Sequence, residues 1–397
     1  MTHGDVWRWR QKFGLSLAVC WRFAGDFRVF HFQTQSCLKR VVGKMKCRLI
    51  AAPAILLAEN IVGTTAFLSN TRATLKPVRP IMTAREVALG LDDEISRWAK
   101  EAGYGDVTSS KPNGSSGWAS FKRVSLNDGP DLFVKSSGRS CKDMFEGEAL
   151  GLQAMFECNR GEDGLRIPEV FHYGDLPDGK GSFLIMEYLN LRGRGDDRAL
   201  GRAVAKMHLA APTAEAGNPT KSFGFPMDNT IGGTLQKNAW SSGGGTDEWV
   251  KFYSEKRMGY QLDLAGDSYC SKLWDGKIAP RLGALFEGLD VQPSLLHGDL
   301  WSGNIGSADG EPSVFDPAVY WGHHEAEWGM SWCASLGAGF WTGYRELIPE
   351  DSGFYDREPL YLAYHYMNHY NLFGGGYLSS ARQELEKVAR NLDKRGA

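Results

Sequence analysis

The residues best able to act together in chemistry lie at positions 297–304, which read His-Gly-Asp-Leu-Trp-Ser-Gly-Asn, and at Asp316, twelve residues beyond Asn304. The apolar pair before this run predicts a strand that opens into a rigid loop. The spacing His-x-Asp-x-x-x-x-Asn, followed by an Asp after an apolar pair, is typical of a phosphoryl-transfer site. There Asp299 would orient the acceptor hydroxyl and take its proton, and Asn304 and Asp316 would supply hard oxygen ligands to Mg²⁺. A lone His-Gly-Asp is often an ordinary turn, but the longer pattern favours catalysis.

A site of this kind needs a lysine against the phosphates, and Lys135 stands at the expected place in the chain order. Residues 121–126 and 131–135, with Asn-Asp-Gly-Pro between them, predict a β-hairpin that ends at Lys135. The helical pattern that follows has an apolar face. At about 100° per residue, Glu148 lies beside that face and Glu146 on its other side. The predicted ion pair is therefore Lys135–Glu148, and Glu146 is predicted to be a solvated helix charge.

Two further segments are predicted to contact a nucleotide. Residues 113–120 form a small-residue loop, and its Ser115, Ser116 and Gly117 would cover the triphosphate with N–H groups and hydroxyls. Residues 182–189 form an apolar strand that ends in an acidic residue, which is typical of a hinge between two lobes. The adenine would then be contacted at Met186, Glu187, Tyr188 and Leu189. Both predictions depend on chain order, because Gly/Ser loops and apolar strands are common.

From about Asp92 to Arg395 the chain resembles the fructosamine-3-kinase (ketosamine kinase) family, relatives of the aminoglycoside and choline kinases. The most specific matches are Met-Phe-Glu-Gly-Glu at 144–148, Met-Glu-Tyr-Leu at 186–189 and the ten residues 295–304. Further matches are Asp316-Pro317-Ala318, Tyr320-Trp321-Gly322-His323 with Glu325, and Tyr366-Met367-Asn368-His369. Aminoglycoside kinases share the His-Gly-Asp core without the Leu-Trp-Ser-Gly-Asn completion, so the match discriminates inside the superfamily.

The resemblance implies an α+β, protein-kinase-like two-lobed fold. An antiparallel-sheet N-lobe with its hinge would span residues 82–189, and a mainly α-helical C-lobe would span 190–397. It also implies ATP and Mg²⁺ as cofactors and phosphorylation at O3 of ribulosamine or fructosamine adducts on amines or proteins. The product then decomposes and frees the amine, which amounts to deglycation repair. Trp301, His323 and Glu325 are implied to lie near the acceptor sugar.

The sequence departs from the family pattern in two places. The phosphate loop of the family usually contains a cysteine, which residues 115–120 lack, so thiol control of this loop is not expected. A glycine-rich insert at 241–246 predicts a flexible loop near the acceptor region. Two other functions stay open. One is a small-molecule kinase for another acceptor, such as an aminoglycoside or choline, and the other is a nucleotide-binding pseudokinase.

Charge divides the chain into two parts. The whole sequence of 397 residues has a formal net charge of −2, but residues 1–80 hold thirteen Lys and Arg against three acidic residues. The acidic remainder argues against nucleic acid as a partner, since nucleic-acid-binding domains carry basic patches. The basic part is interpreted as sorting information or a misplaced gene start, so we assign residues 1–81 to a presequence or leader.

The leader contains segments that are typical of sorting signals. A cationic stretch at 44–48 precedes an apolar core of about ten residues at 49–58, which suits a signal peptide and is too short to span a membrane comfortably. A basic, hydroxyl-rich, acid-free run follows, to Pro80. Together these features resemble the bipartite presequence of algae with complex plastids, so we expect a plastid protein with no stable membrane anchor. A mitochondrial presequence or a disordered cytosolic tail are the alternatives.

Overall fold

A computed structural model describes residues 19–23, 26–30, 84–161, 163–177 and 179–396. The chain forms two compact units, Met1–Pro77 and Val78–Ala397. Of the first unit, the structure describes an antiparallel strand pair, β1 (Val19–Phe23) and β2 (Asp26–Phe30). The sorting signals predicted at 44–58 and up to Pro80 lie outside the described residues. No helix in the described ranges is long and apolar enough to cross a membrane.

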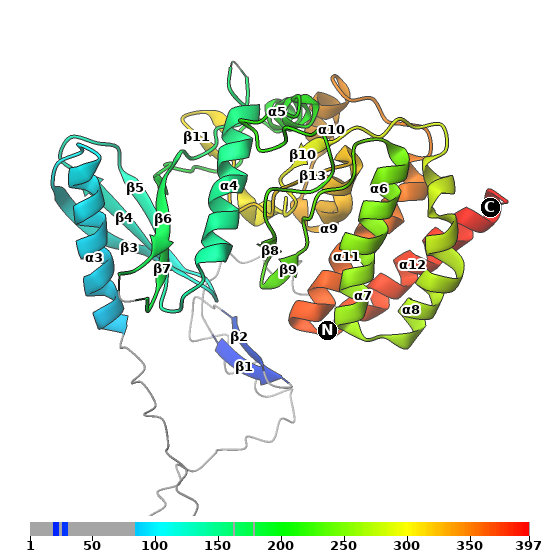
Figure 1. The fold of residues 1–397 in the computed structure, drawn as a ribbon, viewed down its shortest axis with the longest axis horizontal. Coiled ribbons are helices and arrows are strands. Elements are labelled where there is room, and N and C mark those ends of the chain that lie inside the picture. Colours follow the sequence, from blue (N-terminus) through cyan, green and yellow to red (C-terminus); the bar gives the residue numbers. More distant parts are fainter. Residues whose placement is uncertain (1–18, 24–25, 31–83, 162, 178, 397) are drawn as a thin grey trace, which may run out of the picture. The chain divides into compact units, whose positions relative to one another are not determined.

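The N-lobe of the second unit is a five-stranded antiparallel sheet in the order β3-β4-β5-β7-β6 (Figure 1). The strands are β3 (Val107–Ser115), β4 (Ser120–Leu126), β5 (Leu132–Ser137), β6 (Val170–Asp175) and β7 (Ser182–Glu187). The predicted hairpin is confirmed as β4–β5, with Phe121 opposite Lys135. The second strand runs two residues beyond Lys135, so this lysine lies within β5.

Two helices cover the two faces of this sheet. Alternating side chains of β7 divide between them, because successive residues of a strand point to opposite faces. Phe183 and Ile185 belong to a small core with α3 (Ala84–Glu101), while Leu184 and Met186 belong to the main core with α4 (Lys142–Cys158). Figure 1 shows α3 and α4 on either side of the sheet.

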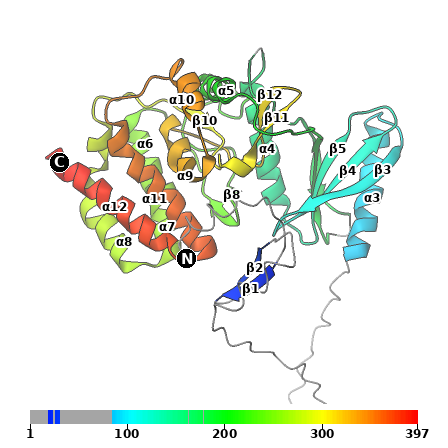
Figure 2. The same ribbon diagram turned by 180° about the vertical axis from the view of Figure 1, so that it is seen from behind.

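The C-lobe is mainly helical, and the predicted two-lobed α+β fold is confirmed (Figures 1 and 2). Its α-helices are α5 (Asp197–Leu209), α6 (Thr246–Phe252), α7 (Tyr260–Ala265), α8 (Ser268–Leu273), α9 (Ser331–Ala334), α10 (Ala338–Arg345), α11 (Phe354–Phe373) and α12 (Tyr377–Lys394). Turns of 3₁₀-helix lie at Ala279–Phe286, Ser302–Asn304 and His324–Met330, and π-helical segments at Tyr253–Gly259 and Trp274–Ile278. Helices α11 and α12 lie side by side in both views.

The C-lobe also contains three short antiparallel strand pairs. They are β8 (Asn229–Ile231) with β9 (Thr234–Gln236), β10 (Ser294–Leu296) with β13 (Tyr320–Gly322), and β11 (Ile305–Ala308) with β12 (Glu311–Val314). The run 297–304 leaves β10, as predicted, and the segment with Asp316 leaves β12. These two strand ends therefore carry the residues that the sequence singled out.

The two loops approach each other closely at Gly298. Its φ of +77° lies in the left-handed region, and an added Cβ would lie 2.2 Å from Ala318 O. Only glycine satisfies both conditions. A backbone bond from Ala318 N to His297 O, at 2.8 Å, joins the same segments. The glycine in His-Gly-Asp therefore lets the catalytic loop lie directly against the segment that follows Asp316.

Two glycines of α4 permit a similarly close approach. A Cβ on Gly147 would lie 2.7 Å from Asn229 Cβ, and one on Gly151 would lie 2.9 Å from Val319 Cγ2. Helix α4 thus packs at backbone distance on β8 and on the segment that precedes β13. Glu148 lies between these two glycines in the sequence. Their close packing therefore fixes the position of Glu148 relative to the C-lobe.

Candidate active site

Asp299, Asn304 and Asp316 come together as the sequence predicted. Asn304 is buried, and its Nδ2 donates to Asp299 O at 2.9 Å and to Asp316 O at 3.2 Å. A longer contact of 3.4 Å joins the same Nδ2 to Asp299 Oδ2. Because the amide nitrogen is used within the protein, the Oδ1 of Asn304 remains as its acceptor atom. One side chain therefore connects both acidic loops and still offers an oxygen.

Asp316 connects the two lobes. Its Oδ1 accepts from Lys135 Nζ at 2.7 Å, and the same Nζ donates to Glu148 Oε1 at 2.5 Å. The predicted Lys135–Glu148 ion pair is therefore present, with a second carboxylate added to it. Asp316 has a φ of +60°, which is uncommon for a residue other than glycine and is tolerated best by Asn and Asp. Such a conformation turns its carboxylate, 59% exposed, toward the interlobe side.

The surroundings of Asp299 suit a proton acceptor. Burial, with the charges of Asp316 and Glu327 adding to it, raises the pKa of Asp299 to about 7. A base whose pKa lies near the working pH combines a large ionised fraction with appreciable basicity. For Asp316, partial removal from water would raise the pKa, but the neighbouring Lys135 outweighs this effect and lowers it. Burial would likewise lower the pKa of Lys135, but Glu148 and Asp316 together raise it, so this lysine stays protonated.

Glu327 supports the backbone of the catalytic loop, and the sequence did not identify this residue as part of the site. Its buried carboxylate accepts from His297 N at 2.7 Å and from Gly298 N at 2.9 Å. His208 is also buried, and its Nε2 lies 3.3 Å from Glu327 Oε2. Nothing in the spacing of Glu325-Ala326-Glu327 separates the supporting glutamate from its neighbour, so no sequence signal was available.

His297 braces the loop with its ring. Its Nε2 lies 3.0 Å from Phe315 O, and its Nδ1 accepts from Asp299 N at 3.2 Å. A carbonyl oxygen can only accept, so Nε2 carries the proton and the ring is neutral. Burial lowers the pKa of His297, in agreement with that state. His297 therefore positions Asp299 through its backbone and is not itself placed as an acid or base.

The small-residue loop is shorter than predicted. Ser115 is the last residue of β3 and pairs with Ser120, so only residues 116–119 form the turn. Ser116 N donates to Ala119 O, and Ser116 Oγ accepts from the N–H groups of Trp118 and Ala119. The turn thus binds most of its own donors. Gly117 N–H is the one backbone donor of the turn with no such role within the described residues.

The hinge segment also uses part of its backbone internally. Glu187 N donates to Glu169 O and Tyr188 N donates to Asp131 O, both at 2.8 Å. Leu189 N–H is the remaining hinge donor, and Met186 is buried in β7. The carboxylate of Glu187 forms an ion pair with Arg166. Of the four residues predicted to contact adenine, Leu189 therefore has the backbone donor suited to that contact.

The residues implied near the acceptor separate into two groups. Trp301 is 41% exposed and its ring lies over Gly303, where an added Cβ would be 2.3 Å away. His323 and Glu325, in contrast, are buried. His323 Nδ1 lies 2.8 Å from Tyr361 OH, and both oxygens of Glu325 accept from Arg357, at 2.7 and 2.6 Å. These contacts hold both side chains within the C-lobe.

An exposed aromatic cluster lies beside the catalytic loop instead. Helix α9 packs on the turn Ser302–Asn304. Burial, with the charge of Asp299 adding to it, raises the pKa of the Cys333 thiol on this helix to about 12. Trp332 of α9 lies with its ring centroid 5.0 Å from Tyr366 and 5.3 Å from His369, both on α11. Phe373 and Tyr377 continue the cluster. These five aromatic rings are called the aromatic cluster below.

Comparison with known proteins identifies the family of this chain. A family model described as fructosamine kinase matches residues 97–391. A rice (Oryza sativa subsp. indica) protein named protein-ribulosamine 3-kinase, chloroplastic is 44% identical over 310 residues, which cover 77% of this chain and 86% of the relative. Its Arabidopsis thaliana namesake is 42% identical over 306 residues, covering 76% and 89%. Mouse ketosamine-3-kinase is 32% identical over 287 residues, covering 66% and 88%.

Among solved structures, a candidate fructosamine-3-kinase of Thermobifida fusca matches with a TM-score of 0.62 and 28% identity, covering 74% of this chain and 97% of its own. A candidate fructosamine-3-kinase of Haemophilus somnus matches with a TM-score of 0.60 and 25% identity, covering 74% and 96%. The matches in sequence and in structure both span the two lobes that carry the site. The chain belongs to the fructosamine kinase family.

Proposed function

We propose that this protein is an ATP-dependent ketosamine-3-kinase, which phosphorylates the sugar O3 of ribulosamine or fructosamine adducts on amines or proteins. The observation that carries the proposal is the meeting of Asp299, Asn304, Asp316 and Lys135 at one interlobe surface, in a chain that belongs to the fructosamine kinase family. The relatives named protein-ribulosamine 3-kinase and ketosamine-3-kinase support the acceptor class. Loss of the phosphorylated sugar from the amine would make the activity a deglycation step.

Each residue has a distinct part in this proposal. Asp299 orients the acceptor hydroxyl and takes its proton, helped by a pKa near neutrality. Lys135, fixed by Glu148, holds the phosphates as a protonated amine. Leu189 N–H binds the adenine, and Gly117 N–H reaches the phosphates from the turn between β3 and β4. Glu327 and His297 hold the Asp299 loop in place without touching the reactants.

The residues present fit a divalent cation. Mg²⁺ prefers carboxylate and carbonyl oxygens, which an exposed Asp316 carboxylate and the free Oδ1 of Asn304 provide. Bound there, Mg²⁺ would neutralise charge on the triphosphate. The Asp316 carboxylate is held by Lys135, so this lysine keeps the oxygen in position for a cation.

For the acceptor, the aromatic cluster supports a sugar-bearing amine. Aromatic faces suit the C–H side of a sugar and the apolar stem of a lysine side chain. Trp332 and Trp301 are both exposed, and Trp332 belongs to the helix that packs on the catalytic loop. We therefore propose that Trp301 and the aromatic cluster contact the glycated amine or glycated protein, in place of His323 and Glu325.

The test is ATP consumption by the full chain with Mg²⁺, comparing ribulose-lysine, fructose-lysine and an aminoglycoside. Turnover on a ketoamine, abolished in Asp299→Asn, is the expected outcome. Turnover on the aminoglycoside alone would replace the acceptor class, and ATP binding without any turnover would favour a pseudokinase. Fragmentation mass spectrometry of the product from each active acceptor tests whether the phosphate is bound to the sugar.

We further propose a plastid location for this chain. The basic composition of residues 1–80 and the two plant relatives named chloroplastic support it. A fluorescent protein that carries residues 1–81 at its N-terminus should enter plastids. Import into mitochondria, or fluorescence spread through the cytosol, would overturn this location while leaving the kinase proposal untouched.

A further inference from the structure

A second group of ionisable side chains lies outside the catalytic group, on the C-lobe. It consists of His323, His324, Glu325 and Asp351, and one possible ligand atom from each lies within 4.8 Å of all the others. The first three begin the turn after β13, and Asp351 belongs to the loop before α11. Two imidazoles and two carboxylates from separate chain segments thus converge.

We propose that this group is a binding site for a first-row transition metal ion of the Zn²⁺ type. Four nitrogen and oxygen donors match the number that such ions take in tetrahedral protein sites. Imidazole is a better ligand for Zn²⁺ than for Mg²⁺ or Ca²⁺, which prefer oxygen alone. The site therefore differs in chemistry from the all-oxygen pair Asn304 and Asp316.

The outer contacts of the group resemble those that orient metal ligands. A ligating histidine normally uses its second ring nitrogen for a hydrogen bond, and ligating carboxylates are themselves hydrogen-bonded. His323 Nδ1 lies 2.8 Å from Tyr361 OH, which leaves Nε2 for the ion. Glu325 is fixed by Arg357 through both oxygens, and each oxygen retains a second lone pair. Both side chains are thus already oriented.

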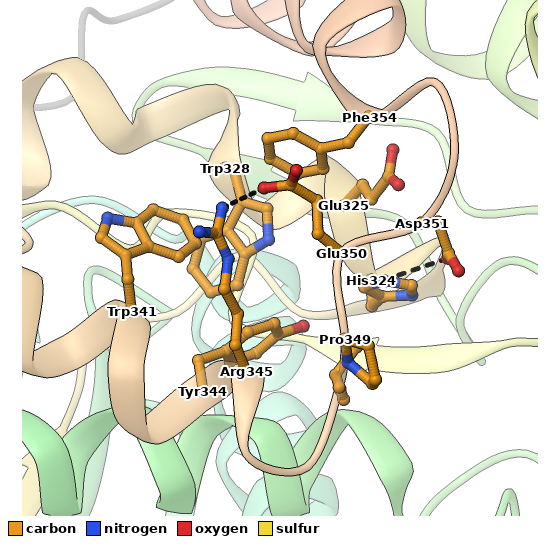
Figure 3. A pocket seen from close by; sticks show the side chains of 11 residues that line it. His324, Glu325, Trp328, Trp341, Tyr344, Arg345, Pro349, Glu350, Asp351 and Phe354 are labelled. Carbon is orange, nitrogen blue, oxygen red and sulfur yellow. Dashed lines mark hydrogen bonds and ion pairs between the residues drawn. The ribbon is translucent and has the colours of Figure 1, made fainter.

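The remaining two donors open toward solvent. His324 and Asp351 line a small surface pocket, together with Glu325, Glu350 and aromatic side chains such as Trp341 and Phe354 (Figure 3). His324 Nε2 lies 4.0 Å from Asp351 Oδ2, a distance that an ion between them would fill with slight closure. Asp351 is 44% exposed, so its side chain can move toward the ion. An ion can therefore enter from the pocket.

Charge balance also permits an ion here. A neutral imidazole has one ring nitrogen with a lone pair available for an ion. Arg357 neutralises Glu325, and Arg345 forms an ion pair with Glu350. Asp351 is the more exposed of the two carboxylates in the group, which makes it, with His324, the residue to substitute.

A bound ion would join the turn after β13 to the loop before α11, and this turn also supports the catalytic loop. The turn His324–Met330 carries Glu327, whose carboxylate holds the backbone of His297 and Gly298. Fixing this turn to the loop before α11 should stabilise the C-lobe. We therefore expect Zn²⁺ to raise the thermal midpoint of the parent protein and to leave that of His324→Ala unchanged.

The decisive experiment is Co²⁺ titration of the full chain in the presence of excess Mg²⁺, followed by visible absorption. Co²⁺ in a tetrahedral nitrogen and oxygen site absorbs strongly in the visible, while cysteine ligands add a sulfur charge-transfer band in the near ultraviolet. That difference separates the proposed site from Cys20, Cys37 and Cys47 of the leader. We expect one equivalent of Co²⁺ to bind with the spectrum of a nitrogen and oxygen site and to be displaced by Zn²⁺.

Variants assign the signal to residues. His324→Ala and Asp351→Ala should each weaken Co²⁺ binding at least tenfold, and the second variant serves if the first does not fold. Glu350→Gln is the matched control, because Glu350 lines the same pocket but is paired with Arg345. Binding unchanged in both alanine variants, only a thiolate spectrum, or no binding would overturn the proposal. Asp316→Asn should retain the signal, which separates this site from the proposed Mg²⁺ site.

Discussion

Lys135 Nζ lies 2.7 Å from Asp316 Oδ1, so a residue of the N-lobe sheet binds the acidic residue that leaves β12 in the C-lobe. The same nitrogen holds Glu148 of α4. One ammonium therefore joins three elements from both lobes. In the proposed reaction, the phosphates bind Lys135 and a cation binds Asp316. The contacts of Lys135 therefore hold the groups of this interlobe surface in position.

Replacing Lys135 with Met should reduce kcat/KM by about 10²–10³-fold, the usual effect of losing one donor aimed at developing charge. The substitution also leaves Glu148 buried beside a neutral side chain, so its thermal midpoint should be measured with the kinetics. Lys122→Met is the matched control, because Lys122 lies on the neighbouring strand and pairs with Asp92 of α3. Equal losses in both variants would remove Lys135 from the phosphate-binding role.

The acidity of Asp299 predicts a pH dependence. Since its pKa is about 7 in the free protein, kcat/KM should fall about tenfold per pH unit below that value as the base becomes protonated. Steady-state rates at saturating Mg²⁺ and low acceptor concentration measure this limb. A rate that stays constant through the region around pH 7 would show that ionisation of Asp299 does not limit the reaction.

The same shift has an effect on stability with a definite sign. The folded state raises the pKa of Asp299 from 3.8 to about 7. Between these two pH values the folded protein therefore holds a proton on Asp299 that the unfolded chain has released. Stability contributed by this group is therefore present at low pH and is lost as pH rises through about 7. Asp299→Asn should unfold at a higher temperature than the parent at pH 8, with a smaller difference at pH 5. The opposite trend would contradict the assigned shift.

Asp316 allows a substitution that keeps the backbone. Asn tolerates the left-handed region as well as Asp does, so Asp316→Asn should preserve the φ of +60° while removing the charge. We expect the Mg²⁺ concentration for half-maximal rate to rise about tenfold or more. Asp309→Asn is the control, because Asp309 also has a positive φ, of +54°, but lies in the exposed turn between β11 and β12. An unchanged Mg²⁺ dependence would exclude Asp316 as a ligand.

Gly151 tests how tightly α4 must approach the C-lobe. An added Cβ would lie 2.9 Å from Val319 Cγ2, so Gly151→Ala should push away the helix that carries Glu148. Overpacking of this kind costs about 1–3 kcal/mol of unfolding free energy. Gly90→Ala in α3 is the control, since nothing lies within 4 Å of its added Cβ and alanine favours a helix. Chemical denaturation of both variants measures the difference.

Much of the site could be predicted because its parts are local in sequence. The loop 297–304 follows directly from β10, and the Lys135–Glu148 pair follows from a hairpin and one turn of helical periodicity. What sequence reasoning missed depends on partners far along the chain. Arg357, which neutralises Glu325, lies 32 residues away, and Glu327, which holds His297, lies 30 residues away. No local pattern reports such pairings, so His323 and Glu325 could not be recognised as interior residues.

Trp332 tests the proposed acceptor surface. It is exposed and belongs to α9, which packs on the catalytic loop, and its ring contacts Tyr366 and His369 of α11. Removing an aromatic contact costs about 1.4 kcal/mol, so Trp332→Ala should raise the KM for a ketoamine about tenfold. The KM for ATP should stay unchanged, because the nucleotide is proposed to contact the hinge and Lys135.

The control for this prediction is Tyr269→Ala, which removes another exposed aromatic residue, on α8. The acceptors to compare are a ribulosylated lysine as the free amino acid and the same adduct within a peptide. A larger loss on the peptide would assign the outer part of the aromatic cluster to the carrier chain, and an equal loss would assign Trp332 to the sugar itself. If the KM values for both acceptors match those of the parent protein, the acceptor lies elsewhere, and Trp301 becomes the aromatic residue to substitute next.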